Sequence, residues 1–269
     1  MSTPLPLPIR VLVKGPSLVN WTYPLGGPRT DFTYPRALEA ELLSDGRPCE
    51  VRAVTMMAEV AGDLLKTWER EILGYSPDVI VLNYGGYESI HLFLPRWLER
   101  HANSLSAPPR LYSRAYRKFL LRPVWKTLAK IQFRVDSKFP TIRKAPTRRM
   151  IADIERYIAQ VQQVGSPMIL LLEMHNATQR RLNWFPGINH RTAIVREETA
   201  KLVARIDKPH VRYVPLLELL DKHSDGDEDA AIPDGFHFSP KMHRVIGAAL
   251  AQEISEWADT QPHLARHPG

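Results

Sequence analysis

The chain has 269 residues, of which 44% are hydrophobic, and a formal net charge of +7. This length predicts one large domain or a domain with an insertion, and the composition is typical of a protein that buries a core. The single cysteine, Cys49, excludes a disulfide framework and a paired-cysteine metal site. No apolar run approaches the roughly 20 residues of a membrane-spanning helix. Because the N-terminal residues lack the basic and apolar regions of a secretion signal, we expect a cytoplasmic protein.

Apolar runs and helical periodicities alternate along the chain. The run from Ile9 to Val13 predicts a buried first strand, which Gly15 and Pro16 end. Further strands are predicted at 50–55, 78–82, 168–172 and 211–214. Helices are predicted at 34–43, 59–73, 147–164, 192–206 and from Pro240 to about 257, the last capped by Ser239. This alternation predicts a five-stranded parallel sheet with helices on both faces, a three-layer αβα sandwich.

The positive charge is concentrated in one segment. Between Arg96 and Arg149, fifteen basic residues stand against two acidic ones, a net charge of +13, so the rest of the chain is acidic. From about Leu92 to Ala145 the pattern predicts short, proline-punctuated, basic amphipathic helices and no strand. We therefore expect core segments at 1–91 and 147–258, a basic helical insertion at 92–146 and a flexible tail at 259–269. The insertion is expected to form a lid, with apolar faces toward the pocket.

Three residues at the two ends of the chain have the chemistry of a serine nucleophile site. Ser17 follows the first strand, at the edge where open α/β sheets bind ligands. Asp234 and His237 lie three residues apart near the C-terminus, with Gly235 available for a tight turn between them. A serine hydroxyl needs a base and a group that orients the base. We therefore predict Ser17 as the nucleophile, His237 as the base and Asp234 as the residue that orients it.

Three motifs resemble those of the SGNH (GDSL-type) hydrolases, over nearly the whole chain except the insertion. Gly15-Pro16-Ser17 stands where that superfamily has GDS, Gly85-Gly86-Tyr87-Glu88 where it has GxND, and Asp234 to His237 matches DxxH. The resemblance implies an SGNH/flavodoxin-like fold and ester hydrolysis without a cofactor. A weaker likeness, in layout more than in motif, is to the branch that contains a diglucosylglycerate octanoyltransferase, and it implies transfer of an acyl group to a sugar-type hydroxyl.

The resemblance also implies an oxyanion hole. Its donors would be the amide of Ser17 and two groups from further sequence motifs of the superfamily. The second motif (block two) would supply a backbone amide near Ala58. The third motif (block three, GxND) would supply a side chain, which is Tyr87 here in place of the family's asparagine. Gly62 is the alternative to Ala58. The side chains of Asn83 and Asn176, both at strand ends, are the alternatives to the Tyr87 hydroxyl. In addition, the aspartate of GDS is replaced by Pro16.

Four residues are predicted to contact the substrate: Trp21, Gly86, Glu88 and His175, all at the ends or edges of predicted strands. The predicted reaction transfers the acyl group of a small-molecule ester, or of an acyl donor such as acyl-CoA or an acyl carrier protein, to water or to an alcohol acceptor. No cofactor, metal or nucleic acid is expected.

Two rival hypotheses use the same residues differently. Loss of the family asparagine at Tyr87 and of the aspartate at Pro16 is compatible with a catalytically degenerate binding protein. The basic amphipathic insertion is also compatible with contact at an anionic membrane surface or with nucleic acid. The sequence carries no nucleic-acid-binding motif, which ranks that last hypothesis lowest.

Overall fold

A computed structural model describes residues 7–22, 27–28, 33–56, 59–90 and 115–264. Its centre is a parallel sheet with strand order β4-β1-β5-β6-β7. The strands are β1 (Ile9–Gly15), β4 (Cys49–Thr55), β5 (Val79–Leu82), β6 (Met168–Leu172) and β7 (Val211–Val214). Every residue of β5 and β6 is buried, as expected for parallel strands that are covered on both faces.

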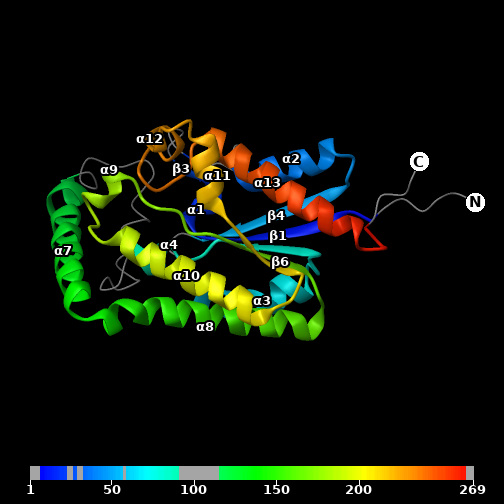
Figure 1. The fold of residues 1–269 in the computed structure, drawn as a ribbon, viewed down its shortest axis with the longest axis horizontal. Coiled ribbons are helices and arrows are strands. Elements are labelled where there is room, and N and C mark those ends of the chain that lie inside the picture. The colour runs from blue at the N-terminus through cyan, green and yellow to red at the C-terminus, as the bar shows by residue number, and fades with distance from the viewer. Residues whose placement is uncertain (1–6, 23–26, 29–32, 57–58, 91–114, 265–269) are drawn as a thin grey trace, which may run out of the picture.

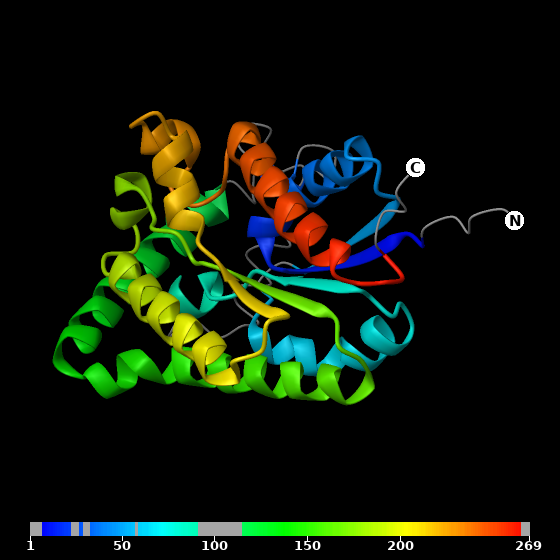
Figure 2. The same ribbon diagram turned by 45° about the vertical axis from the view of Figure 1, so that its right-hand side comes forward.

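Helices cover both faces of this sheet (Figures 1 and 2). On one face α2 (Tyr34–Ser44) packs against α13 (Pro240–Asp259). On the other face lie α3 (Leu64–Trp68), α8 (Pro140–Val164) and α10 (Ile188–Ile206). The three-layer αβα architecture predicted from the sequence is confirmed, including the bounds of β6 and β7.

The strand order places the predicted site at a reversal of the chain's direction of winding. From β1 the chain crosses to β4 on one side and then returns to β5 on the other. Ligands in open α/β sheets bind beyond the carboxyl ends of strands at such a point. There, β1 leads into the short helix α1 (Ser17–Asn20) and β5 leads into α4 (Gly86–Ile90). After α1, β2 (Trp21–Thr22) pairs antiparallel with β3 (Gly27–Pro28).

Three predicted helices differ from the structure at their starts. Helix α10 begins at Ile188 and not at residue 192. The helix expected at 59–73 is a 3₁₀ turn η1 (Ala61–Asp63), then α3, then a π-helical turn η2 (Glu69–Leu73). Helix α8 begins at Pro140 and not at Thr147, and it contains Pro146. A proline inside a helix costs one hydrogen bond and steric strain. Burial of apolar side chains further along the same helix, such as Met150 and Ile154, offsets that cost.

Five short helices were not predicted: α1, α4, α9 (Gln179–Leu182), α11 (Leu216–His223) and α12 (Glu228–Ala231). The last begins within the acidic stretch 225–229. Its start is capped by Asp227, whose side chain accepts a hydrogen bond from the amide of Ala230 at 2.9 Å. The acidic residues of this stretch therefore cap and begin a helical turn.

The described part of the insertion contains the π-helical turn η3 (Arg117–Leu121), the helix α7 (Arg122–Lys138) and the first turns of α8, while its residues 92–114 lie outside the described ranges. The apolar face of α7 was expected to point inward, and this is wrong for part of it. Val124, Ile131 and Phe133 are 40–47% exposed. The buried stripe instead contains Ala129, Gln132 and Asp136.

A buried ion pair explains that orientation of α7. Arg191 of α10 donates from Nε to Asp136 Oδ2 at 2.6 Å, and its NH2 donates to the same oxygen. Its NH1 donates to the carbonyl oxygen of Ser89 in α4 at 2.8 Å. The amide of Gln132, with its oxygen turned toward the guanidinium, adds another acceptor. Polar contacts thus decide which face of α7 is buried.

Within the described ranges, no helix is long and apolar enough to cross a membrane.

Candidate active site

Ser17 is held at the carboxyl end of β1 by a close approach between two strands. A Cβ atom at Gly15 would lie 2.5 Å from the carbonyl oxygen of Asn83, so a side chain at this position would clash. Pro16 then stands at the N-cap of α1, and Ser17 is its first residue. Ser17 is only 4% exposed. Its hydroxyl is therefore enclosed by neighbouring residues and not displayed on an open edge.

The structure brings Ser17, His237 and Asp234 together. The Ser17 Oγ lies 2.9 Å from His237 Nε2. On the other side of the ring, His237 Nδ1 lies 2.6 Å from Asp234 Oδ2. With the proton on Nδ1, His237 donates to Asp234 and accepts from Ser17, which is the tautomer that this arrangement favours. In this state Nε2 is ready to take the hydroxyl proton.

The loop that carries Asp234 and His237 is a tight turn built on Gly235. That glycine has φ +85°, and a Cβ atom there would lie 2.8 Å from the backbone nitrogen of Arg181. The turn lets Asp234 Oδ1 accept from the amides of Phe236 and His237, at 2.9 and 2.7 Å. Burial alone would raise the pKa of Asp234, but the hydrogen bonds and charge of His237, with these amides, outweigh it and lower the pKa. Asp234 is therefore ionised at neutral pH and holds His237 in place.

Trp21 lies against the imidazole of His237, and its expected contact with substrate stays a prediction. Its ring stacks on that of His237 with centroids 5.6 Å apart and an angle of 30° between the planes. His243 of α13 supports it, because its Nε2 lies 3.2 Å from the Trp21 carbonyl oxygen while its Nδ1 accepts from the Tyr34 amide. Burial lowers the pKa of His243 to about 4, so it is neutral at pH 7. The sequence analysis missed this residue.

His175 does not have the contacts expected of a substrate-binding residue. It is 1% exposed, and its Nε2 donates to the carbonyl oxygen of Phe236 at 2.7 Å. Its ring also packs on Phe238, with centroids 4.6 Å apart. Burial lowers its pKa to about 4. His175 therefore has a positioning role in place of the predicted substrate contact. It holds the turn that carries His237 through its hydrogen bond to Phe236 and its packing on Phe238.

The structure describes some of the expected oxyanion-hole residues but not all of them. Ala58 lies outside the described residues. Gly62 lies in η1, where a Cβ atom would be 3.0 Å from Asp153 of α8. Tyr87 is in α4 and partly buried. Gly86, beside it, is buried against Phe236, whose Cζ would lie 3.0 Å from an added Cβ. The block-three segment thus contacts the turn that carries His237.

Glu88 braces two segments of the site. Its carboxylate accepts from the amide of Ala61 at 2.9 Å and from the amide of Gly85 at 3.2 Å. The first amide belongs to the block-two segment and the second to block three. These bonds give Glu88 a positioning role, and its expected contact with substrate stays a prediction.

The two alternative oxyanion donors have other partners. The amide group of Asn83 is buried and donates to the Tyr34 hydroxyl at 3.5 Å. The side chain of Asn176 is exposed, and its oxygen accepts from Arg196 at 2.8 Å. Neither contact presents an amide N–H to Ser17, so Tyr87 remains the candidate for this position.

A buried charged cluster surrounds Lys14, which lies in β1 three residues before Ser17. Lys14 is 1% exposed, and its Nζ lies 2.7 Å from Glu71 and 3.4 Å from Glu59. Glu59 also accepts from the hydroxyl of Tyr84 and from the amide of Met56, at 2.9 and 3.2 Å. Burial raises the pKa of Glu59, although the charge of Lys14 opposes the shift. This cluster ties the end of β1 to the segment that follows β4, and the sequence analysis did not identify it.

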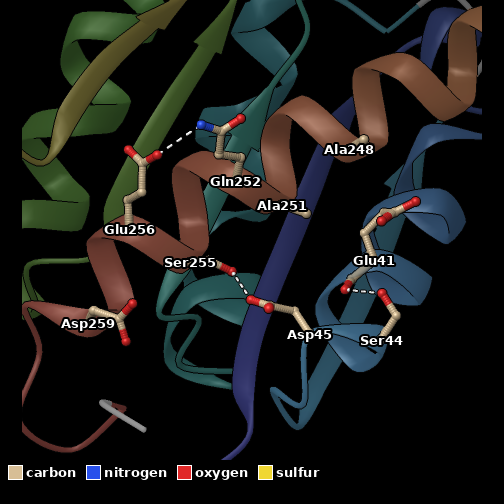
Figure 3. Close-up of a pocket in the computed structure, with 9 residues that line it drawn as sticks. All are labelled: Glu41, Ser44, Asp45, Ala248, Ala251, Gln252, Ser255, Glu256 and Asp259. Carbon is tan, nitrogen blue, oxygen red and sulfur yellow. Dashed lines mark hydrogen bonds between the residues drawn. The ribbon is translucent and has the colours of Figure 1, made fainter.

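A groove of about 420 Å³ lies elsewhere, between α2 and α13 (Figure 3). Its acidic residues are Glu41, Asp45, Glu256 and Asp259. Ser255 donates to Asp45 and Gln252 donates to Glu256 across its wall. No residue of the Ser17 site lines this groove, and its Asp259 pairs with Arg47.

Comparison with known proteins supports the fold. No protein-family model and no curated protein matches the sequence. A lipase/acylhydrolase from Enterococcus faecalis is 15% identical with a TM-score of 0.57, over 91% of this chain and 95% of that one. An acetylxylan esterase from Geobacillus stearothermophilus is 12% identical with a TM-score of 0.57, over 93% and 96%. A carbohydrate acetylesterase from Sinorhizobium meliloti is 13% identical with a TM-score of 0.56, over 93% and 99%.

Other structures with this fold are described as GDSL-family or GDSL-like lipolytic proteins. The chain therefore has the fold of the SGNH/GDSL hydrolases, as the resemblance of its motifs predicted. The matches extend over more than nine-tenths of each chain.

Proposed function

We propose that this protein is a serine esterase or acyltransferase of the SGNH type that forms an acyl-enzyme on Ser17. The observation that supports this most directly is the continuous hydrogen-bonded series from Ser17 through His237 to Asp234. Residues from opposite ends of the chain meet in the order that nucleophilic acyl transfer requires. A serine that merely ended a strand would need no such partners.

In the first half of the reaction, the Ser17 Oγ attacks the carbonyl carbon of an ester while His237 Nε2 takes the hydroxyl proton. The imidazolium that forms is stabilised by the Asp234 carboxylate. The negative oxygen of the tetrahedral intermediate is held by the Ser17 amide, the block-two amide and the Tyr87 hydroxyl. His237 then gives the proton to the departing alcohol, and the acyl group remains on Ser17.

In the second half, water or an acceptor alcohol attacks the acyl-enzyme, and His237 takes a proton from it. The acyl group leaves as a carboxylic acid or as a new ester, and Ser17 regains its proton. The outcome depends on which nucleophile reaches the site, because excluding water favours transfer.

The proposed substrate is an ester of a small molecule or of a sugar-type hydroxyl. The name of the Sinorhizobium meliloti carbohydrate acetylesterase and the layout shared with the octanoyltransferase branch both support it. Exposed cations on α7, such as Lys126, Lys130 and Lys138, would suit a phosphorylated acyl donor or an acidic carrier protein. The same cations, with the exposed Phe133, would also suit an anionic membrane surface.

One feature favours a second function, that of a binding protein without catalysis. Tyr87 stands where the family has an oxyanion-donating asparagine, and loss of such a donor costs about two to three decades in rate.

Labelling with a fluorophosphonate probe separates the two functions, because the probe phosphonylates only an activated serine. We expect stoichiometric labelling at Ser17, located by peptide mass spectrometry, and none in Ser17→Ala. The rate should fall in His237→Ala, which removes the base. A folded protein that is not labelled under conditions that label a known serine esterase would support the binding protein.

A further inference from the structure

Arg181 of α9 has a guanidinium without a polar partner in the described part of the chain. Its Nε is buried and has no hydrogen-bond partner. Among the described residues, no carboxylate or carbonyl oxygen pairs with the rest of the group. Two other arginines near the site differ, since Arg191 is bound by Asp136 and the Ser89 carbonyl, and Arg180 donates to the Pro233 carbonyl.

The position of Arg181 is fixed by aromatic rings and by the catalytic turn. Its guanidinium carbon lies 5.0 Å from the ring centroid of Phe185 and 5.6 Å from that of Phe236. Phe236 in turn meets the ring of His237 edge-on, with centroids 5.5 Å apart. The backbone of Arg181 packs on Gly235, the residue between Asp234 and His237 in this turn. Arg181 is therefore one ring away from the catalytic base.

The charges around Arg181 do not neutralise it. Burial lowers its pKa, and the charges of Asp234 and Tyr87 oppose this shift. An arginine remains protonated in proteins, so the site holds a positive charge. Asp234 forms no hydrogen bond with Arg181, and its carboxylate accepts instead from His237 and from the amides of residues 236 and 237. Leaving a partly desolvated cation without a matched anion is unfavourable until a ligand supplies one.

We propose that Arg181 binds an anionic group, a carboxylate or phosphate, carried by the ester substrate or by the acyl acceptor. The planar guanidinium fork matches either group through two parallel hydrogen bonds. The rings of Phe185 and Phe236 orient this fork and exclude water around it. This inference rests on the proposed function of Ser17 and adds a charge preference to it.

The test compares esters that differ only in one charge. On the leaving-group side, 3-acetoxybenzoate is matched by neutral 3-acetoxybenzamide, and 3-acetoxyphenyl phosphate supplies the phosphate arm. On the acyl side, 4-nitrophenyl hemiglutarate is matched by neutral 4-nitrophenyl pentanoate. We expect the wild type to favour an anionic ester, and Arg181→Gln to lower kcat/KM for that ester at least tenfold more than for its neutral partner. Arg181→Lys should recover part of the preference.

Arg205→Gln is the matched charge control. Arg205 is 53% exposed, pairs with Glu155 and lies in the last turn of α10. It should leave both rates unchanged. An anionic-to-neutral ratio that is the same in the wild type and in a folded Arg181→Gln would overturn the inference, even if Ser17 is active.

A binding measurement makes the inference independent of turnover. In Ser17→Ala, calorimetric titration with 3-acetoxybenzoate, 3-acetoxyphenyl phosphate and 3-acetoxybenzamide should show binding of at least one anion that Arg181→Gln weakens tenfold or more. If the wild type hydrolyses no ester but this difference persists, the proposed function fails and the anion site stands. If no anion binds more tightly than the amide, the anion site fails.

Discussion

The position of α7 should depend on the buried pair between Asp136 and Arg191. Their side chains are 7% and 5% exposed, so each charge is almost fully removed from water. Asp136→Ala would remove the carboxylate that accepts from two nitrogens of the buried Arg191 guanidinium and balances its charge. Removing one partner of a buried ion pair costs about 3–5 kcal/mol. For a chain of this size that corresponds to a fall in Tm of roughly 6–20 °C.

Urea and thermal unfolding, followed by circular dichroism, would measure this loss. The exposed pair of Arg205 and Glu155 is the control, with side chains 53% and 47% exposed. Glu155→Ala should cost less than about 1 kcal/mol. Asp136→Leu combined with Arg191→Met leaves no unpaired charge and should be more stable than Asp136→Ala alone. An Asp136→Ala protein within about 1 kcal/mol of the wild type, or a double variant less stable than the single one, would refute this reasoning.

Three further predictions concern the site and its pH dependence. Tyr87→Phe should slow acylation more than tenfold, a loss of about 1.4 kcal/mol, and Tyr87→Asn should recover part of it, as measured by stopped-flow release of 4-nitrophenol; an unchanged rate would mean that the hydroxyl is not a donor. Asp234→Asn should retain more ester hydrolysis than His237→Ala, because it leaves the base in place; the reverse order would contradict the assigned roles. Burial lowers the pKa of His175 and His243 to about 4, so between about pH 4 and 6.5 the unfolded chain binds more protons than the folded one. Stability should therefore rise with pH through this window, by on the order of 3 kcal/mol per histidine, and His243→Gln should flatten the rise in urea unfolding; an unchanged slope would exclude His243 as a source.

The sequence predicted the sheet well because its strands carry a strong local signal. β6 is Met-Ile-Leu-Leu-Leu, a short apolar run that is buried on both sides. The signal for the start of α13 was equally local. Ser239 caps the helix by accepting from the Met242 amide at 3.3 Å, and Pro240 follows at the first helical position. The spacing of Asp234 and His237 likewise fixed the geometry of their turn.

Other features depend on contacts between distant segments. The inward face of α7 is set by Arg191, which lies 55 residues beyond Asp136 in the chain. Helical periodicity favoured Val124, Ile131 and Phe133 for that face, because it ranks residues by hydrophobicity and cannot include a distant partner. The contacts of His175 could not be predicted for the same reason, because its hydrogen-bond acceptor is a carbonyl oxygen 61 residues away in the chain. The lone guanidinium of Arg181 has no signature in the sequence at all.

The central claim is that Ser17 carries the acyl group during the reaction. The most direct measurement is rapid acid quenching of the enzyme with 4-nitrophenyl acetate, followed by intact-protein and peptide mass spectrometry. The account predicts a transient increase of one acetyl group, located on the peptide that contains Ser17, with a matching burst of 4-nitrophenol and no adduct at that site in Ser17→Ala. Steady turnover of the ester with no acyl group on Ser17 at any quench time, or with the same adduct elsewhere in folded Ser17→Ala, would contradict it.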